Sequence, residues 1–280
     1  MLLRELDDGL HPGIPNEVYF QRDLDIASKS AIDVIVERSL RHYHYYQTHP
    51  EEDNDTPAML LGRAYHALIL EPGDFDNRFV LSPKFDLRTN AGKAALAEFE
   101  LENKGKARLL QHDWDRLQAM ADVMRAHPLA SSILRGAETE ITMLWKDRQT
   151  GVRCKSKMDI LRRDLGIVAD LKTTDDCGSR NFARSAAKYG YHVQHAQYGD
   201  GAAACGIDLK HYLMIAQEKE PPYCVGVHQI NAVAESRGFE IRHDALTSLA
   251  TALETNRWPG PVADDRINEL SLPTWALIGD

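Results

Sequence analysis

Two short apolar segments joined by a turn constrain the fold of this chain more than any other feature. The stretch from Val152 to Lys172 reads VRCKSKMDILRRDLGIVADLK. Side chains of a β-strand alternate between its two faces, so Asp170 and Lys172 are expected to point the same way. If RRDLG joins two antiparallel strands, the face that carries Asp159 lies next to the face that carries Asp170 and Lys172. The sequence therefore predicts two carboxylates and one lysine that converge on a paired set of strands.

The first of these strands also carries basic residues. On its Asp159 face the alternation places Arg153, Lys155 and Lys157, and on the opposite face Val152, Cys154, Met158 and Ile160. A basic rim suits a polyanion, because lysine and arginine bind phosphates. Carboxylates with water are the ligands that Mg²⁺ prefers, and a lysine beside a metal-bound water can orient that water. An Asp-x-Lys sequence alone also fits a solvated strand face, so the rest of the chain has to decide between a site and a surface.

The composition is that of a globular protein that can bury a large core, because 43% of the 280 residues are hydrophobic and 27% are charged. We see no apolar run that approaches the length of a membrane span, and MLLRELDDGL lacks the pattern of a signal peptide. The four cysteines have no CxxC spacing. These features predict a cytoplasmic protein with reduced thiols, no membrane contact and no zinc or iron–sulfur site.

The net charge of −9 argues against a protein that coats nucleic acid in general, which would usually be basic. A local basic stripe is still compatible with an enzyme that acts on DNA. Residues 153–163 contain five basic residues and one acid, which reverses the overall sign.

The apolar periodicity predicts helices first and a sheet afterwards. Residues 1–22 are expected to be extended. Helices are expected at 25–48, 56–72, 92–111, 112–127, 181–206 and 241–256, and strands at 140–146, 152–161, 167–172, 211–217 and 223–230. This order predicts an α/β fold with a mixed central β-sheet flanked by helices. The expected organisation is one domain over 1–280, with an extended segment at 1–22, a helical N-terminal elaboration at 23–130 and a core at 138–260.

Four polar motifs follow one another along the chain. They are Gly62-Arg-Ala-Tyr-His66, Asp159, Asp170-Leu-Lys172 and Gln194-His-Ala-Gln-Tyr198. Each alone is weak, since His66 also fits a core histidine and Gln194 with Tyr198 an ordinary i,i+4 helix pair. In this order they resemble the RecB-like branch of the PD-(D/E)xK nuclease superfamily, which has a GxxxH helix, an Asp that ends a strand, a (D/E)xK strand and a QxxxY helix. The resemblance implies a restriction-endonuclease-like nuclease core.

The resemblance extends over nearly the whole chain. The segments NEVYFQRDLDIASKS, the helical insert at 90–130, TGVRCKSKMDIL, ADLKTT and RWPG are similar to RecE-type (exodeoxyribonuclease VIII-like) exonucleases of phages and prophages. This implies a Mg²⁺-dependent 5′–3′ exodeoxyribonuclease, with Mn²⁺ able to substitute. Such an enzyme degrades one strand of linear double-stranded DNA and leaves 3′ overhangs for phage-type recombination. The resemblance also implies a ring-like homo-oligomer on DNA ends, a single-strand annealing protein as partner, and a phage or prophage product in the cytoplasm of a bacterial host.

The resemblance also implies roles for single residues. Asp159, Asp170 and the carbonyl of Leu171 would bind the metal, and His66 would lie at the metal or at the departing phosphate. Lys172 would position the attacking water. Gln194 and Tyr198 would brace the site or contact the DNA backbone. The basic rim itself predicts DNA binding by Arg153, Lys155 and Lys157. Glu140 is a weaker candidate, because it equally fits a solvated strand end.

Two alternatives stay open at this point. One is a structure-specific or restriction-like endonuclease of the same fold, and the other is a protein of this fold that binds DNA or a partner without cutting it. Intact Asp159, Asp170 and Lys172 favour cleavage. The sequence has no GxxxxGK[ST], HExxH or GxSxG motif, so nucleotide-driven, zinc-protease and esterase chemistry are not expected. No cysteine precedes Cys154, which excludes the RecB-like subgroup that holds an iron–sulfur cluster.

Overall fold

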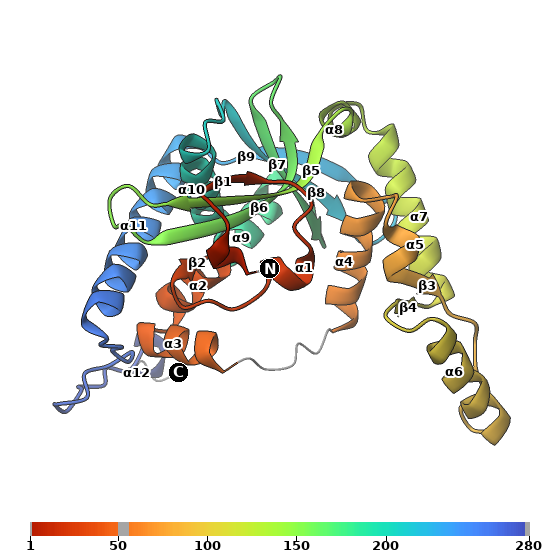
Figure 1. Cartoon of the computed structure of the whole chain (residues 1–280), viewed down its shortest axis with the longest axis horizontal. Coiled ribbons are helices and arrows are strands. Elements are labelled where there is room, and N and C mark those ends of the chain that lie inside the picture. Colours follow the sequence, from red (N-terminus) through yellow and green to blue (C-terminus); the bar gives the residue numbers. More distant parts are fainter. Residues whose placement is uncertain (1, 50–55, 278–280) are drawn as a thin grey trace.

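A mixed β-sheet with helices on both faces forms the centre of the structure, as expected from the sequence (Figure 1). The computed structural model describes residues 2–49 and 56–277. Its larger sheet has seven strands in the order β1-β5-β6-β7-β8-β9, with β2 beside β6. The strands are β1 (Gly9–His11), β2 (Ile26–Ala27), β5 (Glu138–Lys146), β6 (Arg153–Arg162), β7 (Ile167–Thr174), β8 (His211–Glu218) and β9 (Val225–Gln229). β7–β8 and β2–β6 are parallel, and the other pairs are antiparallel.

The helices come from the whole described part of the chain. They are α1 (Asn16–Tyr19), α2 (Lys29–Glu37), α3 (Leu40–Thr48), α4 (Pro57–Leu70), α5 (Phe75–Arg78), α6 (Asn90–Glu102), α7 (Gln111–Ala126), α8 (Pro128–Leu134), α9 (Ser179–Lys188), α10 (Tyr191–Ala204), α11 (Ala232–Thr255) and α12 (Thr274–Leu277). In Figure 1, α6 projects away from the rest of the molecule. None of the helices in the described ranges has the length and apolarity needed to cross a bilayer.

The two faces of the sheet bury separate hydrophobic cores. On β8 the alternation is regular, since Tyr212 and Met214 point into one core and Ile215 into the other. Helices α9, α10 and α11 cover the first face, and α4, α7 and α8 cover the second (Figure 1). Burial of both faces explains why the central stretches of β7 and β8, such as Leu213–Ala216, are apolar outside the Asp170–Lys172 motif.

The N-terminal segment is less extended than expected. It contains a turn of 3-10 helix at Leu3–Glu5, strand β1 and the short helix α1. β1 pairs with β5, while Leu3, Tyr19 and Ile26 pack with Leu144 in a small third core. The segment therefore crosses the second face of the sheet over β5 and β6, where Asn16 and Tyr19 close one side of a cavity.

Several predicted helix bounds are wrong for local reasons. The helix expected at 181–206 is divided into α9 and α10 at Gly190, which has φ of 62° in the left-handed region. The helix expected at 92–111 ends at Glu102, and β4 (Ala107–Leu109) follows and pairs with β3 (Phe79–Leu81). The region 25–48 forms β2 and two helices capped by Ser28 and Ser39.

Candidate active site

Strands β6 and β7 separate at the two predicted aspartates. Their pairing runs from Arg162 opposite Ile167 to Ile160 opposite Ala169, and it stops before Asp159 and Asp170 would meet. There the Oδ2 of Asp159 accepts a hydrogen bond of 2.8 Å from the backbone N–H of Leu171. The Asp159 side chain thus satisfies a backbone N–H of β7 at the point where the backbone pairing of β7 with β6 has ended. The split between the strands opens a place where both carboxylates are reachable.

The neighbouring strand β5 is irregular at the same level. Its pairing with β6 includes Thr139 opposite Ile160 and Ile141 opposite Met158, but it skips Glu140 and Asp159. Glu140 has φ of 55°, a left-handed conformation that is costly for a residue with a side chain. The irregularity shifts the alternation along β6, because Met158 and Ile160 pack in different cores. The expectation that Ile160 shares a face with Cys154 and Met158 is therefore wrong.

The irregularity brings Glu140 to the site. One side-chain ligand atom from each of His66, Glu140 and Asp159 lies within 4.8 Å of the others, a spacing that suits a shared metal ion. Glu140 was the weaker sequence candidate, because a glutamate near a strand start has no distinguishing pattern. Its position depends on the left-handed backbone conformation, which the sequence does not predict.

Helix α4 supplies His66. Thr56 caps this helix by accepting from the N–H of Met59, and Pro57 follows as its first residue. The Nδ1 of His66 lies 3.7 Å from the Oδ2 of Asp159. Desolvation lowers the pKa of His66 to about 4. The imidazole is therefore neutral near pH 7, which is the form that can bind a metal.

Asp170 is almost completely buried, with 2% of its surface exposed. Its Oδ1 accepts a 2.7 Å hydrogen bond from Nε2 of Gln194 on α10, and its Oδ2 forms an ion pair with Lys172. The ammonium of Lys172 also lies 4.8 Å from the centre of the Tyr191 ring. Burial alone would lower the pKa of Lys172, but the adjacent Asp170 and Asp159 raise it. Lys172 thus stays positively charged between the carboxylates and α10.

Tyr198, the second member of the QxxxY motif, contacts the sheet. Its hydroxyl donates a 2.7 Å hydrogen bond to the carbonyl oxygen of Lys157. Between the two motif residues, Nε2 of Gln197 lies 3.3 Å from the carbonyl oxygen of Ala27 and 3.4 Å from that of Lys155. These contacts hold α10 against β2 and β6, and so fix the position from which Gln194 reaches Asp170.

The acidic cluster is electrostatically unfavourable by itself. Burial and then the carboxylates of Asp170 and Glu140 raise the pKa of Asp159 well above its usual value. Burial also raises the pKa of Glu140. A divalent cation would relieve both the repulsion and the desolvation, and carboxylate oxygens with one imidazole form a chemically suitable donor set. The residues present therefore fit a divalent metal ion.

The three basic residues predicted to bind DNA contact protein groups in the structure. Arg153 pairs with Asp8 and donates to the carbonyl oxygens of Arg4 and Leu6. The Nζ of Lys155 donates to the carbonyl oxygens of Tyr19 (2.6 Å) and Gln21 (3.0 Å). These contacts attach the N-terminal segment to β6.

Lys157 has a different environment, although it too is buried. Its Nζ donates to Oδ1 of Asn16 at 2.6 Å and lies 3.2 Å from Oε2 of Glu140. Its link to the acidic cluster distinguishes it from Lys155 and Arg153. DNA binding by the three residues stays a prediction.

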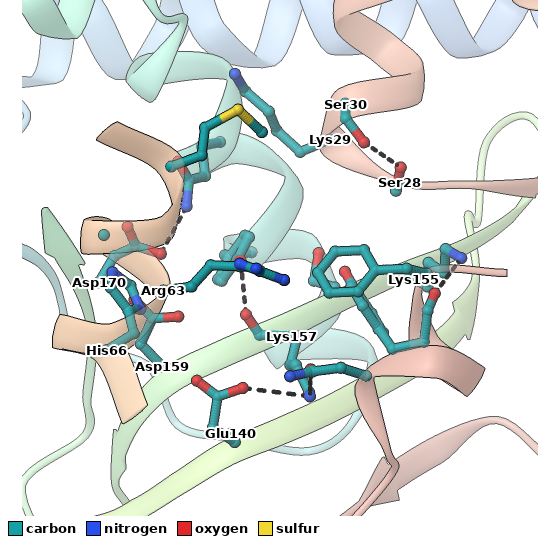
Figure 2. Close-up of a pocket in the computed structure, with 18 of the residues that line it drawn as sticks. Ser28, Lys29, Ser30, Arg63, His66, Glu140, Lys155, Lys157, Asp159 and Asp170 are labelled. Atoms are coloured by element: carbon teal, nitrogen blue, oxygen red, sulfur yellow. Dashed lines mark hydrogen bonds and ion pairs between the residues drawn. The ribbon is translucent and has the colours of Figure 1, made fainter. Parts of the chain in front are cut away.

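All six residues expected to act in catalysis line one cavity of about 640 Å³: Lys172, Asp170, Asp159, His66, Gln194 and Tyr198. Figure 2 shows His66, Asp159 and Asp170 gathered on one side of it and Arg63 extending from α4 into its middle. The opposite wall comes from Ser28, Lys29 and Ser30 at the start of α2, and Asn16 and Tyr19 also contribute. These wall residues and Arg63 could not be recognised as site residues from the sequence, because no local pattern distinguishes them from surface residues.

Two aspartates and a lysine lie where β6 and β7 separate, and a GxxxH helix and a QxxxY helix flank them. This arrangement defines a nuclease fold of the PD-(D/E)xK type. Residues 29–264 match the family described as a PDDEXK-like domain of unknown function (DUF3799), and the chain belongs to this family. A search of curated proteins found no match.

One solved structure supports the fold. A candidate exonuclease from Eubacterium rectale aligns with a TM-score of 0.59 and 13% identity, over 95% of this chain and 98% of that one. A phage related exonuclease from Haemophilus somnus 129PT aligns with a TM-score of 0.33 and 12% identity, over 60% of this chain and 84% of that one. The first likeness establishes the restriction-endonuclease-like fold, and the second adds no argument.

Proposed function

We propose that this protein is a Mg²⁺-dependent 5′–3′ exodeoxyribonuclease that degrades one strand of linear double-stranded DNA and leaves 3′ overhangs. The observation that carries the proposal is the convergence of Asp159, Asp170, Lys172 and His66 in one cavity at the split between β6 and β7. The polarity and the preference for ends rest on the resemblance to RecE-type exonucleases. The likeness to the E. rectale protein, which is itself named only as a candidate exonuclease, agrees with this assignment.

In this proposal His66, Asp159 and Asp170 hold the metal, with Glu140 as a further carboxylate and the Leu171 carbonyl as a backbone ligand. When bound, the ion would activate a water molecule and stabilise the charge that develops on the phosphate. Mn²⁺ is expected to replace Mg²⁺, because both bind carboxylate oxygens.

The residues of the chain have separate tasks. Gln194 fixes one oxygen of Asp170, so the other oxygen and Lys172 keep a defined direction. Because neighbouring carboxylates raise the pKa of Lys172, we expect it to act as a charged hydrogen-bond donor that orients water and phosphate. Tyr198 braces α10 on β6 through the Lys157 carbonyl.

The wider biology belongs to the same proposal. We expect the enzyme to load on DNA ends as a ring-like homo-oligomer, to act with a single-strand annealing protein, and to work in the cytoplasm of a bacterial host as a phage or prophage product. DNA binding by Arg153, Lys155 and Lys157 is part of this expectation.

The test is digestion of linear and covalently closed circular duplexes with Mg²⁺, with the 5′ and 3′ ends labelled separately. The proposal expects early release of the 5′ label from linear DNA and an intact circle. Rapid nicking of the circle would favour an endonuclease, early loss of the 3′ label would reverse the polarity, and binding without cleavage would favour a non-cutting protein. Asp170→Asn serves as the inactive control in each reaction.

A further inference from the structure

Lys157 is a buried cation beside the metal-binding cluster that the proposed chemistry does not use. Figure 2 shows its side chain between Glu140 and the N-terminal segment. The side chain is 10% exposed, and that of Glu140 is 16% exposed. At 3.2 Å, Nζ of Lys157 and Oε2 of Glu140 form an ion pair with little solvent between them.

The ammonium is directed to Glu140 by a second contact. Oδ1 of Asn16 accepts a 2.6 Å hydrogen bond from Nζ, and the Tyr19 ring centre lies 5.5 Å from the same atom. The Tyr198 hydroxyl fixes the backbone of Lys157 from the other side. Asn16 and Tyr19 precede residues 29–264, which match the family, so the family match does not include the groups that hold this lysine.

We propose that Lys157 is the internal counter-ion of the metal centre: directed by Asn16, its ammonium neutralises Glu140 when no divalent ion is bound and lowers the affinity of the site for that ion. This inference rests on the proposed function only in requiring that the cluster binds a divalent ion. It gives Lys157 a positioning and charge-balancing role that is distinct from the expected contact with DNA phosphates.

The physical reason is competition between two cations for one carboxylate. Without a metal, three largely buried carboxylates converge at the site, and the Lys157 ammonium offsets part of their repulsion. When a divalent ion enters, it meets an oxygen already paired with that ammonium and is repelled by its charge. Removing the ammonium should therefore strengthen ion binding and weaken the ion-free fold.

Lys155 provides a matched control. It lies two residues away on the same strand and is also buried, and its amine bonds to the carbonyl oxygens of Tyr19 and Gln21 instead of a carboxylate of the cluster. Lys157→Met and Lys155→Met remove the same charge from β6, but only the first releases Glu140. Asn16→Asp is a second test variant, since its new carboxylate would draw the Lys157 ammonium from Glu140 without removing the lysine.

The experiment is a titration of the full-length proteins with Mn²⁺ in the absence of DNA, with free Mn²⁺ measured by electron paramagnetic resonance. For Lys157→Met the expected Kd for Mn²⁺ falls about tenfold. Asn16→Asp should change in the same direction by a smaller factor, and Lys155→Met should stay within about twofold of wild type. The melting temperature of Lys157→Met should be lower than that of wild type without Mn²⁺ and should rise more when Mn²⁺ is added.

Unchanged or weaker Mn²⁺ binding by Lys157→Met and Asn16→Asp would overturn the inference, as would an equal gain in Lys155→Met. If both lysine variants lose DNA affinity while their Mn²⁺ affinity stays that of wild type, the lysines bind DNA and the inference is wrong. If neither wild type nor any variant binds Mn²⁺, the metal-dependent function itself fails, which separates the two failures.

Discussion

The carboxylate of Asp159 on β6 accepts a hydrogen bond of 2.8 Å from the backbone N–H of Leu171 on the neighbouring strand β7. This contact joins β6 to β7 where their regular pairing has ended. The same oxygen, Oδ2, lies 3.7 Å from Nδ1 of His66, and Glu140 offers a ligand atom within 4.8 Å of both residues. The same bond that maintains the sheet therefore also orients a candidate metal ligand.

Asp170→Asn is expected to reduce cleavage at least about a hundredfold, because it removes a charged metal ligand while keeping the size of the side chain. The measurement is the initial rate on linear duplex at saturating Mg²⁺, with circular dichroism to show that the fold is kept. Asp175→Asn is the control, since Asp175 follows the same strand but is 91% exposed. Near wild-type cleavage by folded Asp170→Asn would place the metal elsewhere.

Lys172→Arg is expected to be nearly as inactive as Lys172→Met. The ammonium lies between Asp170 and the Tyr191 ring, where a compact charge fits and a planar guanidinium does not direct its donors to the same point. Single-turnover rates for both variants provide the check. Recovery of most of the wild-type rate by arginine would mean that any positive charge is sufficient.

The elements that carry the main motifs could be predicted because their signals are local. The period of two over Val152–Leu171 predicts paired strands, and the Thr56-Pro57 start predicts the helix that carries His66. The order of the motifs then indicates which faces converge, and the structure brings the predicted residues into one cavity.

The parts that could not be predicted depend on distant contacts. The left-handed backbone conformation of Glu140 occurs where the pairing of β5 and β6 is interrupted, and no property of the EITMLWK segment predicts it. Asn16 reaches Lys157 across 141 positions of sequence. From the alternation alone, the basic face of β6 is expected to be exposed. The N-terminal segment covers this face, and no local pattern in the sequence predicts that contact.

Gln194→Met is expected to weaken metal binding about tenfold to a hundredfold, because Gln194 holds one oxygen of Asp170 and outer partners of metal ligands typically have effects of this size. Excess Mg²⁺ should restore much of kcat. The measurements are the Mg²⁺ dependence of cleavage and Mn²⁺ binding without DNA. Tyr198→Phe is a matched control on the same helix. It loses the bond to the Lys157 carbonyl and should lower the free energy of unfolding by about 1 kcal/mol with a smaller effect on metal affinity.

The stability of wild type relative to Lys155→Met should depend on pH above neutrality. Desolvation lowers the pKa of Lys155 from 10.5 to about 8. Between these values the unfolded chain binds more protons than the folded one, so the free energy of unfolding rises with pH, and below about pH 8 the difference is constant. The rise relative to Lys155→Met should be up to about 3 kcal/mol. Urea unfolding of both proteins at about pH 7, 8.5 and 10 measures it, and a difference that is flat or falls with pH would contradict the prediction.

Gly62→Ala should make the protein more stable and less active. Gly62 lies inside α4, where alanine is favoured over glycine by about 0.5–1 kcal/mol. A Cβ atom at this position meets no heavy atom within 4 Å, and Gly62 lines the cavity one turn from His66. The added methyl group should therefore take up part of the cavity in which the proposed substrate would bind. Gly62→Leu should extend the effect and raise the KM for DNA further. Gly201→Ala is the contrasting control, because its Cβ would lie 2.9 Å from the Trp145 ring and should lower stability. Thermal unfolding and steady-state cleavage of the three variants provide the test, and unchanged kinetics in Gly62→Leu would mean that the substrate does not pass this turn of α4.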